Sequence, residues 1–367
     1  TEAVLSEARR AGAEAADALA LSGESLSDEV RDGALEQAER AEGVELGLRV
    51  LIGKRQAVVA TSDIRPDALS AVAERAVARA REAPEDPYCG LAEPDQLAPN
   101  AGFPELDMVD PAAPPGPDAL ERKARAAESA ALGVAGVATM DAAGASWSLT
   151  RSHLATSTGF SGGHARSVHG IQAVAITGEG LAMERDYAYE SRCHGADLPP
   201  AEATGRLAGD RAVARRGAEK PPTGAYPVVY DERVASGLIG HLVQAINGSS
   251  IARGASWLKD ARGEPVLPDG IDLVEDPLRP RVSGSAPFDG EGLATARRAL
   301  VEDGVLQGWV LDLATGRKLG LPSTANARRG PGAPPSPGVT NLNLTQGKAG
   351  RAELLAEMGT GLLVTSL

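Results

Sequence analysis

The sequence has few cysteines and no long apolar run. Cys89 and Cys193 are the two cysteines among 367 residues, so one disulfide at most can form and the fold cannot depend on a disulfide framework. No apolar run approaches the roughly 18 residues that a membrane-spanning helix needs. Residues 1–21 also lack the order of basic, apolar and small residues that marks a signal peptide. We therefore expect a cytoplasmic protein that does not associate with a membrane.

Basic and aromatic side chains are scarce as well. The chain has 37 Lys and Arg residues against 50 Asp and Glu residues, a net charge of −13, and aromatic residues make up 3%. Nucleic-acid affinity needs clustered cations that displace counterions from phosphates, and base stacking needs aromatic rings. The composition therefore disfavours a nucleic-acid partner.

What remains is the composition of a globular chain with many turns. Hydrophobic residues make up 43%, and 43 glycines and 25 prolines are spread along the sequence. Periodicity and turn residues first predict a helix over residues 2–19, strands over 25–30, 44–52 and 56–61, and a helix from Pro66 to Pro84. A Pro-rich connection over about 84–117 leads to a helix over 118–132. Strands then follow over 134–190, with turns at Gly144, Gly162-Gly163 and 178–180, and a helix over 199–216 ends this part of the chain.

A Pro-rich boundary at residues 220–224 separates a second unit, so we expect domains at 1–222 and 223–367. The order of the elements favours an α+β fold, with an N-terminal layered α/β sandwich followed by a mainly antiparallel, β-rich C-terminal domain. The elements expected in the second unit are a strand over 226–230, a helix capped by Asp231 and ending at Asn247-Gly248, a hairpin around Asp303-Gly304, and a Gly/Pro-rich loop over 328–339.

Two local motifs have simpler interpretations than catalysis. Residues 159–163 match the G-x-S-x-G elbow, which places a nucleophilic serine before a helix, but residues 167–177 read as a strand. We interpret this motif as a glycine turn within a sheet. Cys193 and His194 are adjacent, and neighbouring side chains of an extended segment point to opposite faces, so a shared metal ion is not expected.

A metal site on the helix over residues 232–246 would need two ligands that project from the same side of the helix. His241 is its only histidine. Four and five residues later come Ala245 and Ile246, and Leu242 stands where a zinc peptidase carries its general-base glutamate. We predict a packing helix without a metal site, with His241 at the margin of an apolar side formed by Val234, Ala235, Leu238, Ile239, Leu242 and Ile246.

A family resemblance rests on several short stretches in a fixed order from about residue 44 to the end. Together they resemble the TldD/PmbA family, once described as modulators of DNA gyrase and now regarded as metallopeptidase-like proteins. The stretches are GLRV at 47–50, TSD at 61–63, APEDPY at 83–88, GFSGG at 159–163, MERDY at 183–187, NGSSIARG at 247–254, DP at 276–277, FDGEG at 288–292 and TNL at 340–342.

The resemblance also indicates a branch of that family. TldD-like members carry a His-Glu-x-x-x-His helix that binds the catalytic metal, whereas PmbA-like (TldE) members lack it. The matching helix here reads His241-Leu242-Val243-Gln244-Ala245-Ile246, which is typical of the PmbA branch. Family members continue through further strands beyond the position of Leu367, so the last strands of the C-terminal domain are expected to be missing.

For this branch the resemblance implies a non-catalytic subunit of a TldD/TldE heterodimer that cuts unfolded or short peptides. Zinc is then expected only in the TldD-type partner, with no cofactor, catalytic residue or metal ligand in this chain. A homodimer is the alternative assembly. The candidates for a substrate cleft are His241, Asn247, Ser249, Asp289 and Glu291.

Other interpretations stay open at this point. Asp289 and Glu291 form either an acidic corner for a cation or for the basic end of a peptide, or a solvated turn. Together with His164 and His169 they are the candidate site of an independent peptidase. A third function is that of a regulatory protein acting on DNA gyrase, as the older family name implies.

Overall fold

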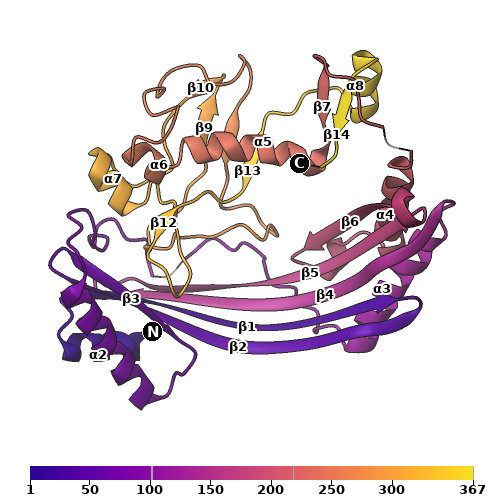
Figure 1. The fold of residues 1–367 in the computed structure, drawn as a ribbon. Helices are drawn as coiled ribbons and strands as arrows, with labels where there is room; N and C mark the ends of the chain where they lie inside the picture. Colours follow the sequence, from indigo (N-terminus) through magenta and orange to yellow (C-terminus); the bar gives the residue numbers. More distant parts are fainter. Residues whose placement is uncertain (101, 218, 367) are drawn as a thin grey trace.

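The computed structural model describes residues 1–100, 102–217 and 219–366. Its N-terminal part is built on one long, curved antiparallel sheet with the strand order β3-β2-β1-β4-β5-β6 (Figure 1). Most neighbouring strands of the sheet are consecutive in the chain and form hairpins. The pairing of β1 with β4 joins the first three strands to the last three. The strands are β1 (Ala15–Arg31), β2 (Ala34–Ile52), β3 (Arg55–Thr61), β4 (Val137–Thr156), β5 (Ser161–Thr177) and β6 (Glu184–Arg192).

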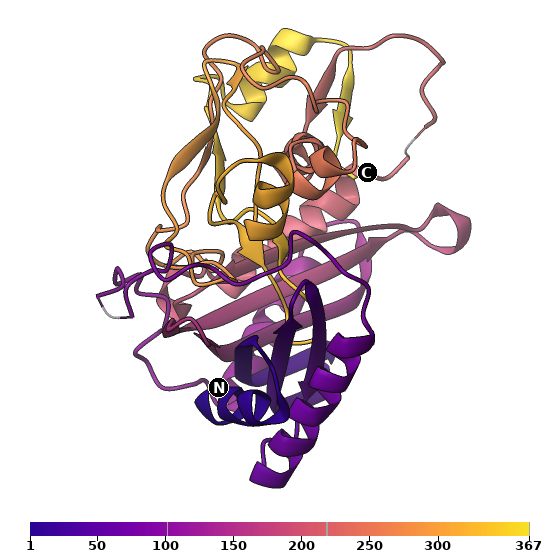
Figure 2. The same ribbon diagram turned by 90° about the vertical axis from the view of Figure 1, so that its left-hand side faces the viewer.

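Helices cover one face of this sheet, and the C-terminal part lies over the other, concave face (Figures 1 and 2). Alternate residues of β1, such as Ala16 and Ala18, pack against α1 and α2, while α3 and α4 cover the opposite end of the same face. None of the described helices is long and apolar enough to cross a membrane. These helices are α1 (Glu2–Ala11), α2 (Pro66–Glu82), α3 (Pro117–Leu132) and α4 (Ala201–Ala214), with single 3₁₀ turns η1 (Gly180–Ala182) and η2 (Gly195–Asp197).

The predicted helix over residues 2–19 is wrong in its second half. The helix ends at Ala11, where Gly12 takes the left-handed conformation with φ 102°, and β1 begins at Ala15. Alanine favours a helix in isolation, but β1 is paired along most of its length with β2 on one side and β4 on the other. Long-range pairing therefore overrides the local preference.

Two of the turns expected between residues 134 and 190 are also wrong. Gly144 lies inside β4, and Gly162-Gly163 lies inside β5. At Gly144 an added Cβ would lie 3.2 Å from Gln172 Nε2, so this glycine relieves crowding inside the sheet. The chain turns instead at residues 157–159, where Gly159 has φ 109°. The turn at residues 178–180 is confirmed.

The C-terminal part combines short strands with short helices around its own core. It contains an antiparallel sheet of order β10-β9-β8-β13, the antiparallel pair β11-β12 and the parallel pair β7-β14. The α+β fold class is confirmed, whereas the division at residue 222 stays a prediction. The elements are β7 (Val228–Tyr230), α5 (Glu232–Ala245), α6 (Gly248–Ala252), β8 (Leu273–Glu275), β9 (Arg298–Glu302), β10 (Val305–Leu306), α7 (Leu313–Leu319), β11 (Ala327–Arg328), β12 (Ser336–Pro337), β13 (Leu342–Leu344), α8 (Arg351–Met358) and β14 (Leu362–Val364).

The loop between β11 and β12 docks onto the concave face of the N-terminal sheet. Arg329 donates from Nη1 to Asp17 Oδ1 at 2.6 Å, and Arg49 donates from Nε to Asp17 Oδ2 at 2.9 Å. The Pro331 backbone lies against Gly47, where an added Cβ would be 2.0 Å from the Pro331 carbonyl oxygen. Any side chain at position 47 would thus displace the loop, so Gly47 permits this close contact.

Candidate functional site

Helix α5 is the element in which the metal site of a TldD-like protein would lie. Asp231 caps its N-terminus by accepting from the Arg233 backbone N–H at 3.2 Å, as predicted. Leu242 and Ile246 are buried in the C-terminal core, together with residues such as Leu273 and Leu300. Among the other residues predicted to pack, Leu238 is an exception, because 41% of it is exposed. His241 is exposed and lies outside this core.

The side chains at the three motif positions of α5 do not fit a metal ion. Leu242 and Ile246 carry only carbon, so neither can ligate a cation or take a proton from water. His241 alone supplies one nitrogen donor. Elsewhere in residues 1–100, 102–217 and 219–366, no group of three or more His, Cys, Asp or Glu side chains is placed to hold a metal.

Asn247 and Ser249 lie at the junction between α5 and α6. Asn247 Oδ1 accepts from the Ser249 backbone N–H at 2.9 Å, and Asn247 Nδ2 donates to the Pro337 carbonyl at 2.9 Å. The residue between them, Gly248, is packed so closely that an added Cβ would lie 2.7 Å from the Val310 carbonyl oxygen. These contacts join the helix junction to β12, which borders the cavity described below.

Asp289 and Glu291 form a buried turn, so the expectation of a solvated turn is wrong. Asp289 accepts from the backbone N–H groups of Glu291, Leu293 and Ala327 at 2.9–3.0 Å. Glu291 accepts at 2.9 Å from the N–H of Leu313, the first residue of α7. The two carboxylates hold backbone segments that are distant in sequence.

Burial dominates the acidity of this pair. Removal from water raises the pKa of Asp289 to about 6, although three backbone donors oppose the shift. Burial and the neighbouring Asp289 carboxylate raise the pKa of Glu291 to about 8. Burial thus favours the neutral form of both carboxyl groups, and more strongly for Glu291 than for Asp289.

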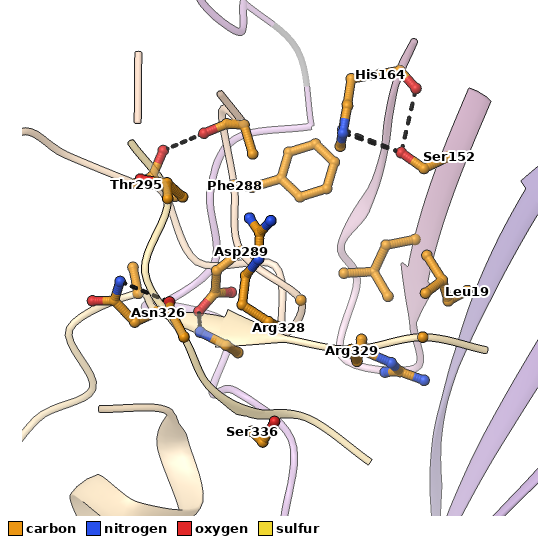
Figure 3. Close-up of a pocket in the computed structure, with 18 of the residues that line it drawn as sticks. Leu19, Ser152, His164, Phe288, Asp289, Thr295, Asn326, Arg328, Arg329 and Ser336 are labelled. Atoms are coloured by element: carbon orange, nitrogen blue, oxygen red, sulfur yellow. Dashed lines mark hydrogen bonds between the residues drawn. The ribbon is translucent and has the colours of Figure 1, made fainter. Parts of the chain in front are cut away.

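A cavity of about 490 Å³ lies between the concave face of the N-terminal sheet and the C-terminal part. Figure 3 shows Leu19 and Ser152 on one side and Thr295, Asn326 and Ser336 on the other. Of the five predicted cleft residues, Asp289 lines this cavity, whereas the other four do not. The remaining lining residues used below are Leu154, His164, Arg166, Phe288, Arg328 and Arg329.

His164 and His169 do not share a site, because their odd spacing on β5 places them on opposite faces of the sheet. His164 lines the cavity, with Ser152 Oγ 3.3 Å from its ring nitrogens and the Phe288 ring centroid 5.6 Å away. His169 is buried on the helix-covered face, with Nε2 3.0 Å from Asp110 Oδ2. The four side chains of the independent-peptidase interpretation are therefore not brought together around this cavity.

Sequence reasoning missed the arginines of the cavity. Arg166 comes from β5 and Arg328 from β11, and they are 162 positions apart. The signal available was weak: Arg328-Arg329 is a basic pair beside a Gly/Pro-rich loop, and Arg166 lies two residues from His164 on the same strand face. Only the fold shows that these segments meet.

Three consecutive family models match most of this chain. PmbA/TldA metallopeptidase domain 1 matches residues 16–80, the central domain matches 110–216 and the C-terminal domain matches 223–367. Metalloprotease PmbA of Escherichia coli O157:H7 is 32% identical over 342 residues, which cover 93% of this chain and 74% of that protein. The chain belongs to the PmbA/TldD family.

A second relative and a solved structure extend the match. A metalloprotease PmbA homolog of Haemophilus influenzae is 33% identical over 370 residues, covering 98% of this chain and 77% of that protein. A crystal structure from Bacteroides thetaiotaomicron, described as a candidate modulator of DNA gyrase, superposes with a TM-score of 0.89 at 26% identity, over 100% of this chain and 80% of the other. The resemblance to the PmbA branch is thereby confirmed.

Proposed function

We propose that this chain is a non-catalytic, PmbA-type (TldE) subunit of a TldD/TldE-type metallopeptidase that cuts unfolded or short peptides. The observation that carries the proposal is the burial of Leu242 and Ile246 in the core of the C-terminal part, at the positions where TldD-like members carry the base and the second metal ligand. Zinc and the activated water then belong to a TldD-type partner, and this chain contributes part of the wall around the substrate.

The net charge and the cysteines support a peptide substrate and a cytoplasmic location. The net charge of −13 suits a surface that attracts basic peptides rather than nucleic acid. Cys89 and Cys193 are both free and buried, which suits the reducing cytoplasm. Without the partner, a homodimer is the alternative assembly.

The test compares this chain, its TldD-type paralogue and an equimolar mixture of the two. We expect co-purification, zinc only in the paralogue, and cleavage of an unfolded protein and of a fluorogenic peptide by the mixture. The matched control is a mixture in which the paralogue has lost its first ligand histidine. Peptide cleavage by this chain alone, with stoichiometric zinc and complete inhibition by EDTA, would refute the proposal.

A further inference from the structure

The cavity between the sheet and the C-terminal part carries more positive than negative charge. Its charged lining residues are Arg166, Arg328, Arg329 and Asp289. This local excess of cations occurs in a chain whose net charge is −13. A pocket whose sign opposes that of the whole molecule favours an anionic ligand.

Arg329 has donors without a protein acceptor. Its side chain is 1% exposed, and Nη1 binds Asp17 at 2.6 Å. Nε and Nη2 are buried and have no hydrogen-bond partner among the described residues. These two nitrogens form one edge of the guanidinium, the edge that pairs with a carboxylate through two parallel N–H groups. Because buried donors without acceptors are costly, they need an acceptor from outside the described residues, either an ordered water or a ligand.

Arg166 and Arg328 add two more guanidinium groups to the lining. Arg166 donates from Nη1 to the Ser283 carbonyl at 2.7 Å, and Arg328 forms no ion pair within 4.0 Å in the part of the chain that the structure describes. Figure 3 shows the Arg328 side chain running past Asp289 toward the Phe288 ring. Burial, Arg166 and Arg328 lower the pKa of His164 to about 4, so its ring is neutral at physiological pH.

Asp289 neutralises only part of this charge. Both of its oxygens already accept backbone N–H groups. The lining therefore keeps a net positive charge that attracts an anion.

Part of the remaining wall is apolar. Leu19 and Leu154 come from β1 and β4, and Phe288 from the C-terminal part; together with Phe160 they belong to one buried cluster. A volume of about 490 Å³ lies within the usual range of roughly 300–1,000 Å³ for small-ligand sites. The cavity thus offers guanidinium groups to an anion and an apolar surface to the group attached to it.

We propose that this cavity binds the free C-terminal carboxylate of a peptide together with its last, apolar side chain. Arg328 and Arg166 contact the carboxylate, Arg329 adds a third positive charge to the lining, and the apolar part of the wall receives the side chain. The choice of a peptide rests on the proposed function, whereas recognition of the carboxylate rests on the cavity alone.

The test is isothermal titration of the purified full chain with three acetylated tripeptides. The first is Ala-Ala-Leu with a free carboxylate, the second is its C-terminal amide, and the third is Ala-Ala-Glu amide, whose only carboxylate is in a side chain. We expect the free acid to bind at least about tenfold more tightly than either amide, since charge-assisted hydrogen bonds are lost. Arg328→Gln and Arg166→Gln are each expected to weaken binding of the acid by about tenfold.

Arg185→Gln is the matched control, because Arg185 lies on β6, is exposed and does not line the cavity. It should bind like the wild type, and unchanged unfolding midpoints would show that the variants remain folded. Equal binding of acid and amide, or full affinity in Arg328→Gln, would overturn the proposal. Equal binding of the Glu amide would assign the cavity to side-chain carboxylates, and competition by inorganic phosphate at the same affinity would make it a general anion site; either result also overturns it.

These outcomes are separate from the test of the proposed function. Carboxylate binding is measured on this chain without a partner, whereas peptide cleavage is measured with and without the TldD-type paralogue. A chain that binds no free acid but completes an active mixture would refute only the cavity. A chain that binds the acid and cuts peptides alone would refute only the non-catalytic role.

Discussion

Replacement of Asp17 by Asn tests how the C-terminal part is held on the sheet. Asp17 is fully buried and accepts from both Arg49 and Arg329. Burial alone would raise the pKa of Asp17, but the two guanidinium groups outweigh it and hold the pKa below its ordinary value of 3.8. Asp17→Asn keeps the size of the side chain and leaves two buried cations without a countercharge.

The expected cost follows from that unpaired charge. Removing one partner of a buried ion pair typically destabilises a protein by about 3–5 kcal/mol. Here one carboxylate serves two arginines whose side chains are 4% and 1% exposed, so we expect a loss of about 3–5 kcal/mol at pH 7. Because the folded-state pKa is depressed, this contribution is present above pH 3.8 and lost as the pH falls through the folded value.

The assay is urea denaturation followed by tryptophan fluorescence, with Trp147 reporting on β4 and Trp309 on the C-terminal core. Asp63→Asn is the control, because Asp63 forms an exposed pair with Arg65, and it should leave both transitions unchanged. A double-mutant cycle with Arg329→Gln should show strong coupling to Asp17. If Asp17→Asn unfolds like the wild type at pH 7, the contacts of Asp17 with Arg49 and Arg329 do not hold the two parts together.

Four further outcomes are expected. Gly47→Ala should destabilise by about 1–3 kcal/mol in thermal unfolding, since its Cβ would meet the Pro331 carbonyl oxygen at 2.0 Å; an unchanged midpoint would contradict the packing. Because the pKa of Glu291 is raised, this residue stabilises the fold fully below pH 4.5, its ordinary pKa, and loses that contribution as the pH rises through about 8. Glu291→Gln should therefore make the denaturation midpoint less dependent on pH over this range. NMR titration of His164 should give a midpoint of about 4, and a value near 6.5 would contradict the burial of His164 beside Arg166 and Arg328. Leu300→Ala, at a fully buried position, should cost about 2–5 kcal/mol in urea denaturation.

Local sequence patterns predict an element correctly where its tertiary contacts favour the same backbone conformation. Asp231 caps α5, and Asp303-Gly304 turns the chain between β9 and β10, because a capping side chain and a positive-φ turn act within a few residues. The N-terminal helix was overextended because β1 owes its extended form to β2 and β4. Neither partner strand is visible in the composition of residues 15–19.

The site was less predictable than the fold. The FDGEG stretch identified Asp289 and Glu291 correctly as residues at a turn, but their burial depends on Ala327 and Leu313, whose contact follows only from the tertiary structure. On α5 the prediction depends on the atoms that the side chains of Leu242 and Ile246 carry, and the sequence alone gives these. The three cavity arginines lie on segments that meet only after folding.

The cavity exists only while the C-terminal part stays docked, because Leu19 and Leu154 form one wall and Phe288 and Arg328 the other. A ligand that fills it binds the docked state alone and must therefore stabilise docking by its own binding free energy. Linkage requires the reverse as well, so weakened docking lowers the apparent affinity in proportion to the fraction of chains that remain docked. Asp17 does not line the cavity, yet Asp17→Asn should weaken binding of the Ala-Ala-Leu acid once undocked chains become populated near the unfolding transition. Docking and ligand binding in this chain are thus one coupled equilibrium.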